Sequence, residues 1–131
     1  MIFLVDHNLE GHARILLGSI ASQGWLDFID IRFVMFEDIG LDIDSNDRTV
    51  WRAAQKEKMI LFTANRSMKG DDSLEQVMRE ENAQASLPVV TVGDANRLMI
   101  DPIYRAQCVD RLIEIAMYTA NYLGARRVFI P

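Results

Sequence analysis

The chain contains a single cysteine, Cys108, among its 131 residues, and this scarcity excludes several classes of protein. One cysteine cannot form a disulfide within the chain, and it rules out a zinc site built from several cysteines. The sequence also lacks a long apolar run, so no segment is expected to span a membrane. The first residues lack the basic stretch of a secretory signal and indicate a buried strand instead. These absences together predict a cytoplasmic protein.

Basic residues are also in deficit, because the formal net charge is −5. That balance argues against a broad basic surface that would hold nucleic acid non-specifically. It does not exclude a nuclease, since acids that bind a metal ion contribute negative charge of their own. With only two histidines, His7 and His12, the chain makes a histidine-based metal site or catalytic triad unconvincing. The length and composition are typical of a single globular domain covering residues 1–131.

Short apolar runs alternate with segments of helical spacing along the whole chain. Strands are predicted at residues 2–5, 29–36, 59–63, 89–92 and 127–130. Helices are predicted at residues 9–23, 73–82 and 104–123, and from a cap at Asp44 or Ser45 to residue 58. This alternation is typical of a three-layer α/β/α domain with a mainly parallel sheet of four or five strands.

Polar residues follow the predicted strands, at the edge where ligands bind in open parallel sheets. Those nearest the strand ends are Asp6, Asn8, Thr63, Asn65, Arg66 and Asp94. Asp47 lies in the first turn of one helix, and Asp72 lies at the start of the next. Carboxylates are the ligands that Mg²⁺ and Mn²⁺ prefer, so the set indicates a metal site. Each acid also has a purely structural explanation, as a turn former, a helix cap or a partner of the helix dipole.

Three segments carry a resemblance to a known family. The run Phe3-Leu4-Val5-Asp6-His7-Asn8-Leu9 resembles the opening of PIN-like domains, in which a strand leads into an Asp-x-Asn-Leu segment. Asp47, ahead of Val50 and Ala54, matches the second acid of small bacterial PIN-like proteins. The strand ending in Thr63-Ala64-Asn65-Arg66 matches a Thr-x-Asp motif except that Asn65 replaces the acid. With Gly70-Asp71-Asp72-Ser73-Leu74, this resembles an uncharacterised bacterial branch of that group.

The resemblance implies a Mg²⁺- or Mn²⁺-dependent ribonuclease. Its catalytic residues are then Asp6, Asp47 and Asn65, with RNA as substrate and contacts to it from Asn8, Thr63, Arg66 and Lys69. Asn65 is a neutral and weaker ligand, so Asp72 or Asp94 joins Asp6 and Asp47 as a candidate metal ligand. Many PIN-like proteins belong to toxin–antitoxin pairs, which adds an antitoxin protein to the expected partners.

Two other functions remain open. Phosphatases of the haloacid dehalogenase type also place an Asp after the first strand, and Asp6, Thr63, Lys69 and Asp94 occur in the order that they use. That resemblance is weaker, because the chain is short for the fold and Lys69 follows Thr63 closely. The third possibility is a binding module in which Asn65 marks lost catalysis. The apolar face of the 104–123 helix either packs in the core or forms a homodimer interface.

Overall fold

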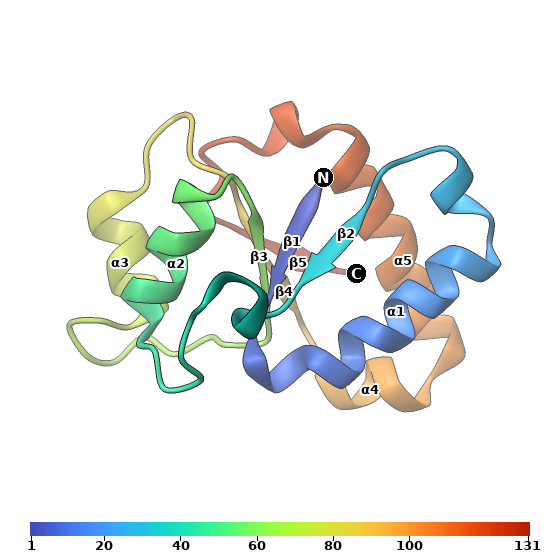
Figure 1. Ribbon diagram of the computed structural model, residues 1–131, viewed down its shortest axis with the longest axis horizontal. Helices are drawn as coiled ribbons and strands as arrows, with labels where there is room; N and C mark the ends of the chain where they lie inside the picture. Colours follow the sequence, from blue (N-terminus) through green and yellow to red (C-terminus); the bar gives the residue numbers. More distant parts are fainter.

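The computed structural model describes residues 1–131 and contains a five-stranded sheet between two layers of helices (Figure 1). The strands are β1 (Ile2–Val5), β2 (Arg32–Val34), β3 (Ile60–Thr63), β4 (Val89–Val92) and β5 (Arg127–Ile130). All neighbouring strands are parallel, in the order β2-β1-β3-β4-β5. The predicted three-layer α/β/α architecture is therefore confirmed, with five strands in the sheet.

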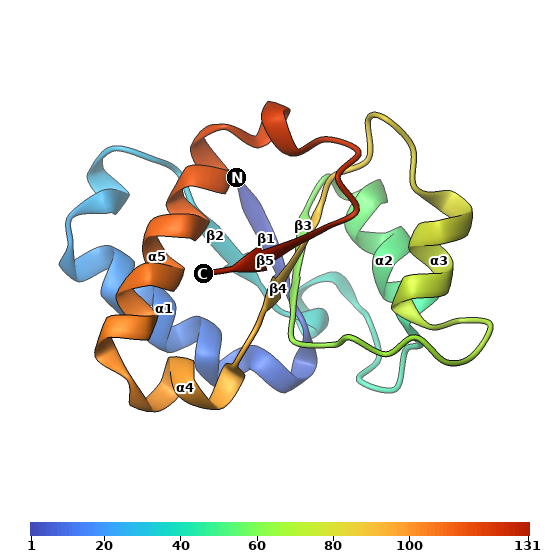
Figure 2. The ribbon, with the colours of Figure 1, turned by 180° about the vertical axis from the view of Figure 1, so that it is seen from behind.

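Helices cover both faces of the sheet. One layer consists of α1 (Glu10–Ser22), α4 (Ala95–Ile100) and α5 (Pro102–Met117), and the other of α2 (Asp47–Lys56) and α3 (Leu74–Glu81) (Figure 2). Short 3₁₀ turns complete the chain at η1 (His7–Leu9), η2 (Trp25–Asp27), η3 (Phe36–Ile39) and η4 (Thr119–Tyr122). No helix is both long enough and apolar enough to cross a lipid bilayer.

Alternation along the strands divides the buried side chains into two cores. Phe62 faces the larger core, under α1, α4 and α5, whereas Leu61 faces the smaller core, under α2 and α3. The central strands are apolar at nearly every position because both of their faces are covered. Cys108 and Leu112 of α5 are fully buried in the larger core, so the apolar face of this helix packs inside the domain.

Several element boundaries differ from those predicted. The cap of α2 is Asn46, whose side chain accepts a hydrogen bond from the Thr49 N–H at 2.8 Å, rather than Asp44 or Ser45. The strand predicted at residues 29–36 is limited to β2, because the 3₁₀ turn η3 begins at Phe36. The short helix α4 was not predicted, and Asp101 separates it from α5 by capping the latter.

The strand order creates a switch point between β1 and β3. The chain leaves β1 through α1 on one face of the sheet, and it leaves β3 toward α3 on the opposite face (Figure 1). Two neighbouring loops therefore diverge at the carboxyl ends of these strands. Such a divergence opens a crevice, and ligands of open parallel sheets bind there.

Candidate functional site

A pocket of about 190 Å³ lies at this switch point. Its polar walls are formed by Asp6, His7, Asn8, Ser45, Asp47, Thr63 and Asn65. Its apolar walls are formed by Phe36, Ile43, Val50, Leu61 and Leu74. The residues after β1, the end of β3 and the start of α2 therefore meet in one cavity, as expected from the positions of Asp6, Asp47 and Asn65 in the sequence.

Asp6 is held against the end of β3. Its N–H donates to the Phe62 carbonyl at 2.9 Å, which extends the β1–β3 ladder by one residue. The buried Thr63 hydroxyl donates to Asp6 Oδ2 at 2.7 Å. Asp6 precedes the turn η1 but makes no capping hydrogen bond with its side chain. Capping therefore does not explain this acid, and its Oδ1 accepts no hydrogen bond from the chain.

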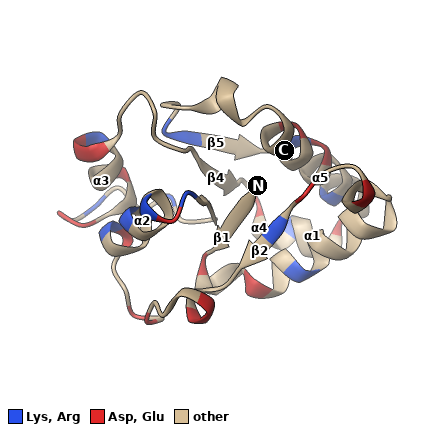
Figure 3. Ribbon diagram, turned by 45° about the horizontal axis from the view of Figure 1, so that its top comes forward, with Lys and Arg blue, Asp and Glu red and all other residues tan.

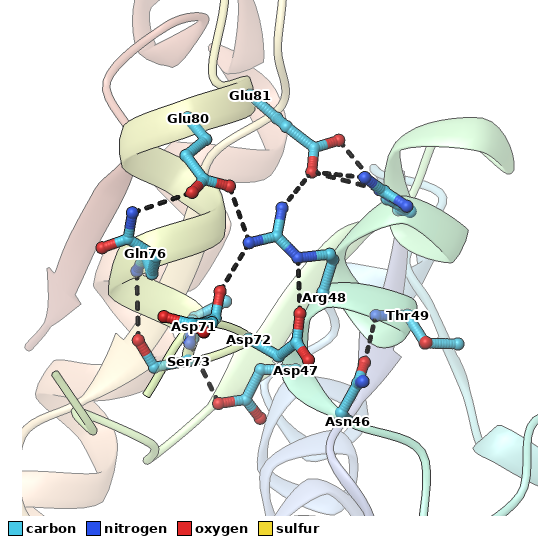
Figure 4. Close-up of polar contacts among 12 residues, drawn as sticks. Asn46, Asp47, Arg48, Thr49, Asp71, Asp72, Ser73, Gln76, Glu80 and Glu81 are labelled. Atoms are coloured by element: carbon cyan, nitrogen blue, oxygen red, sulfur yellow. Dashed lines mark hydrogen bonds and ion pairs between the residues drawn. The ribbon is translucent and has the colours of Figure 1, made fainter. Parts of the chain in front are cut away.

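Asp47 is the first residue of α2, and its carboxylate joins two other segments. Oδ2 accepts hydrogen bonds from the Asn65 side-chain amide at 2.9 Å and from the Leu74 N–H at 3.0 Å. Figure 4 shows this carboxylate beside the first turn of α3. The second bond satisfies an N–H at the start of α3 that has no partner within its own helix. The other oxygen, Oδ1, receives no donor from the chain.

Asn65 connects the two acids. Its backbone N–H donates to Thr63 Oγ1 at 2.9 Å, and its side-chain NH₂ group donates to Asp47. A continuous chain of hydrogen bonds thus runs from Asp6 through Thr63 and Asn65 to Asp47. The side-chain oxygen of Asn65 accepts from the Ser67 N–H at 2.8 Å. Asn65 lies in the pocket as predicted, but it presents a donor to Asp47 where the PIN-like motif has a carboxylate.

Asp72 and Asp94 do not line the pocket. Asp72 Oδ1 accepts from Arg48 Nε at 2.8 Å and forms an ion pair on the outer side of α2. Asp94 caps α4, because its Oδ1 accepts from the Arg97 N–H at 3.0 Å. It follows β4, one strand away from the switch point, and leads into a helix on the other face. The structure therefore does not bring these two acids together with Asp6 and Asp47.

Two of the predicted substrate contacts lie outside the pocket. Arg66 and Lys69 are exposed in the loop between β3 and α3, and neither has an ion-pair partner in the chain. The same loop carries Asn65, so both cations are attached to a segment that forms the pocket wall. Asn8 and Thr63, the other two predicted contacts, line the pocket itself.

A dense ion-pair cluster lies beside the pocket, between α2 and α3 (Figure 4). Arg48 binds Asp72, Glu80 and Glu81, and it also donates to the Asp71 carbonyl at 2.6 Å. The carboxylates raise the pKa of Arg48, with Asp72 contributing most. The pKa of Glu81 is lowered, mainly by Arg52 and further by Arg48. This cluster fixes the start of α3, which supplies the Leu74 N–H to Asp47.

Cys108 has no part in the site. It is fully buried in α5, and burial raises the pKa of its thiol to about 11. A thiol in this environment stays protonated at neutral pH and is a poor nucleophile.

The donor set of the pocket suits a divalent cation that takes few of its ligands from the protein. No three His, Cys, Asp or Glu side chains gather closely enough to hold a metal ion by themselves. The pocket does offer two carboxylates, each with an oxygen that accepts no hydrogen bond from the chain. Mg²⁺ is commonly bound by one or two carboxylates, with water and substrate phosphate oxygens as its other ligands. The residues present fit that arrangement.

The sequence did not indicate every pocket residue. Phe36, Ile43 and Ser45 come from the long connection between β2 and α2, where the sequence indicated only a strand ending at residue 36 and a helix cap at Asp44 or Ser45. Their position depends on the fold of that connection, in which η3 packs Phe36 into the smaller core.

The fold and the pocket together define a parallel α/β domain with two carboxylates at its switch point. Comparison of the chain with family models, with curated proteins and with solved structures found no match.

Proposed function

We propose that the chain is a Mg²⁺- or Mn²⁺-dependent ribonuclease of the PIN-like type, with Asp6 and Asp47 as metal ligands. The observation that carries this proposal is the pocket at the β1–β3 switch point, which both acids line. Each carboxylate is oriented by hydrogen bonds to one oxygen and leaves the other oxygen without a donor. Two fixed and partly unsatisfied carboxylates in one pocket suit a hard cation better than they suit a purely structural role.

The residues around the carboxylates have distinct tasks in this proposal. A bound cation lowers the pKa of a coordinated water and neutralises charge on a phosphodiester. Thr63 orients Asp6, and Asn65 orients Asp47. Asn8 and Ser45 offer hydrogen bonds to the sugar or phosphate from the pocket wall. Arg66 and Lys69, exposed in the loop that carries Asn65, offer positive charge to phosphates near the pocket.

The proposed partners follow from the surroundings of the pocket. Because the net charge is −5, a wide basic surface that holds RNA electrostatically is not expected. RNA is proposed to bind through local contacts near the pocket instead. An antitoxin protein is the second proposed partner. Ile43, at the pocket, and Met68, in the loop after β3, are 63% and 70% exposed and offer apolar contacts for it.

The first test is cleavage of a fluorescent single-stranded RNA by the purified chain with Mn²⁺. We expect cleavage that EDTA abolishes. Asp6→Asn and Asp47→Asn are each expected to lower the rate by more than about 100-fold, beyond the usual effect of residues that only support a ligand. Asp110→Asn, an exposed acid of α5, is the matched control and should leave the rate unchanged.

Other outcomes separate the alternatives. RNA cleavage that persists in Asp6→Asn, or that needs no metal, would contradict the proposal. Phosphate release from small esters without RNA cleavage would favour the phosphatase, although Lys69 and Asp94 lie outside the pocket. Absence of cleavage, of phosphate release and of Mn²⁺ binding would favour a binding module.

A further inference from the structure

Arg127 is a buried cation on the strand farthest from Asp6 in the order of the sheet. It is the first residue of β5, and its side chain is only 8% exposed. Val128 and Ile130 of the same strand enter the larger core, so Arg127 and Phe129 point to the opposite face. On that face Glu75 of α3 contacts Arg127 at the start of β5, whereas Phe129 remains 48% exposed. Figure 3 shows the basic start of β5 at this edge of the sheet.

The guanidinium of Arg127 joins three other segments. Nε and Nη2 donate to Glu75 Oε1 of α3 at 2.9 and 2.7 Å. Nη1 donates to Thr91 Oγ1 of β4 at 2.6 Å and to the backbone carbonyl of Asn65 at 2.7 Å. Every nitrogen of the guanidinium therefore donates at least one hydrogen bond. Its planar fork is suited to such simultaneous contacts, which a lysine ammonium cannot reproduce.

Burying the Arg127–Glu75 pair is not an efficient way to stabilise the folded protein. A buried ion pair often stabilises a protein no more than well-packed apolar residues would, because both charges lose their hydration. Glu75, the partner of Arg127, is 29% exposed, and Thr91 is fully buried. The remaining contact, to the Asn65 carbonyl, is the one that reaches the pocket. It joins residues 62 positions apart in the sequence and ties the backbone of this loop to β5, whereas the Asn65 side chain ties it to α2.

Asn65 is consequently held at each of its polar groups. Its N–H binds Thr63, its carbonyl binds Arg127, its side-chain oxygen binds the Ser67 N–H, and its NH₂ group binds Asp47. Without the Arg127 contact, the Asn65 carbonyl has no hydrogen-bond partner in the chain, and its backbone would be held only through the N–H bond to Thr63. The alignment of its side-chain amide matters to Asp47, because the Leu74 N–H is the only other donor to that carboxylate.

We infer that Arg127 is a positioning residue for the pocket: acting through Asn65, it fixes the orientation of the Asp47 carboxylate. The consequence for metal binding and cleavage rests on the proposed function, whereas the orientation itself does not. Residues that orient a metal ligand typically change metal affinity by about 10- to 100-fold when they are altered.

The orientation is tested directly by NMR of the metal-free protein with ¹⁵N-labelled asparagine. In Arg127→Met we expect the side-chain NH₂ signals of Asn65 to move upfield and to exchange faster with water, as the bond to Asp47 weakens. Arg111→Met is the matched control. Arg111 is also a partly buried arginine, but it lies in α5, where it pairs with Glu114 and donates to the Tyr122 hydroxyl and has no contact with Asn65. It should leave the Asn65 signals in place. Unchanged Asn65 signals in Arg127→Met would overturn the inference.

Milder variants protect the test against loss of folding. Glu75→Gln keeps the shape of the partner of Arg127 but removes its charge, and it should move the Asn65 signals in the same direction by a smaller amount. Arg127→Lys keeps the charge and should not restore the wild-type signals, since a single ammonium cannot span all three acceptors. Full restoration by lysine would overturn the inference, because charge alone would then suffice.

The functional consequence is measured by titration with Mn²⁺ alone, without RNA. We expect Arg127→Met to weaken Mn²⁺ binding by roughly 10-fold or more, with no change in Arg111→Met. Equal affinity in wild type and Arg127→Met would overturn the inference while leaving the proposed function intact. If the wild type itself binds no Mn²⁺, the proposed function fails, and the Asn65 signals alone decide the role of Arg127.

Discussion

Asn65 illustrates how one neutral side chain stabilises an acidic pocket. Its NH₂ group donates to Asp47 Oδ2, so one oxygen of the carboxylate is satisfied by the chain and Oδ1 stays free. A carboxylate at position 65 would face Asp47 with a second negative charge, and like charges at such a distance disfavour ionisation of one another. With Asn65 the pocket can form without a metal ion, but it has one carboxylate fewer to bind one.

We therefore predict that Asn65→Asp makes the protein depend on metal for stability. Without metal, loss of the donor and the new repulsion should lower the free energy of unfolding by about 1–3 kcal/mol. The loss should be larger at about pH 8 than at about pH 5. Repulsion raises the pKa of the carboxylate pair in the folded state, so the folded state is favoured while the pair holds a proton and is disfavoured once the pair loses it as pH rises. Thermal unfolding with and without Mn²⁺ measures both effects.

The control for this prediction is Asn121→Asp, an exposed substitution in η4 with the same change of charge. It should show neither the pH dependence nor a gain from Mn²⁺. An Asn65→Asp variant as stable as the wild type in EDTA at both pH values would contradict the role assigned to Asn65.

Much of the pocket, but not its hydrogen bonding, was predictable from the sequence. Asp6 and Thr63 end neighbouring strands, and alternation places them on one face, so their proximity follows from the pattern. The role of Asn65 did not follow, because a motif specifies a residue type and not the direction of its amide. Nothing in the sequence linked Arg127 to Asn65, since their contact depends on the reach of a long side chain across β4.

At the scale of elements, α2 and α3 form a unit held by charge as well as by apolar packing. Val50, Trp51 and Met78 lie in the smaller core, while Arg48 and Arg52 bind the acids of α3 on the outside. Acidic and basic residues are seen together on both helices in Figure 3. Because α3 supplies the Leu74 N–H to Asp47, the docking of this helix also shapes the pocket.

We predict that acid loosens α3 before the rest of the domain. Hydrogen bonding lowers the pKa of Glu80, mainly through Gln76 and then Arg48, and that of Glu81, mainly through Arg52. Carboxyl groups with lowered pKa values stabilise the folded state at pH above their ordinary pKa of about 4.3. This stabilisation is lost as pH falls through the lower pKa values that the groups have in the folded state. Hydrogen exchange of the α3 amides, compared with β1, measures the loosening.

Arg48→Met should speed exchange in α3 at neutral pH and flatten its dependence on pH below about 4.3. Arg52→Met is the matched control and should have a smaller effect, because Arg52 binds only Glu81, whereas Arg48 binds three acids. Equal exchange in wild type and Arg48→Met across this range would contradict the role of the cluster.

The strands were easier to predict than the connections between them. Each apolar run produced a strand, because burial on both faces leaves an unambiguous signature. The six-residue helix α4 was missed, since it is too short to show a full helical period, and Asp94 and Asp101 cap two successive helices there. Such short elements are determined by local capping and by packing of Leu98 into the larger core.

On the scale of the whole molecule, two cores share one sheet. Strands β1 and β3 contribute to both, with Phe3 and Phe62 in the larger core and Leu4 and Leu61 in the smaller. A substitution that unfolds one core removes the support of the sheet on which the other packs. The two cores are therefore expected to unfold in one cooperative transition.

The two tryptophans test this cooperativity, because Trp51 lies in the smaller core and Trp25 packs against the larger. Urea transitions followed by Trp51 fluorescence in Trp25→Phe, and by Trp25 fluorescence in Trp51→Phe, should each coincide with the circular dichroism of the same variant. Leu112→Ala, in the larger core, should lower the free energy of unfolding by about 2–5 kcal/mol when read through Trp51 as well. A Trp51 signal unaffected by Leu112→Ala would contradict a single transition.

The two ends of the sheet have a consequence for self-association. An edge strand exposes unpaired backbone groups that can recruit another chain into a growing fibril. Here β2 is only three residues long and begins with the exposed Arg32, and β5 is preceded by the exposed Arg126. Short edges flanked by cations repel one another when two copies approach edge to edge. The protein should therefore resist amyloid-like assembly even though its central strands are almost entirely apolar.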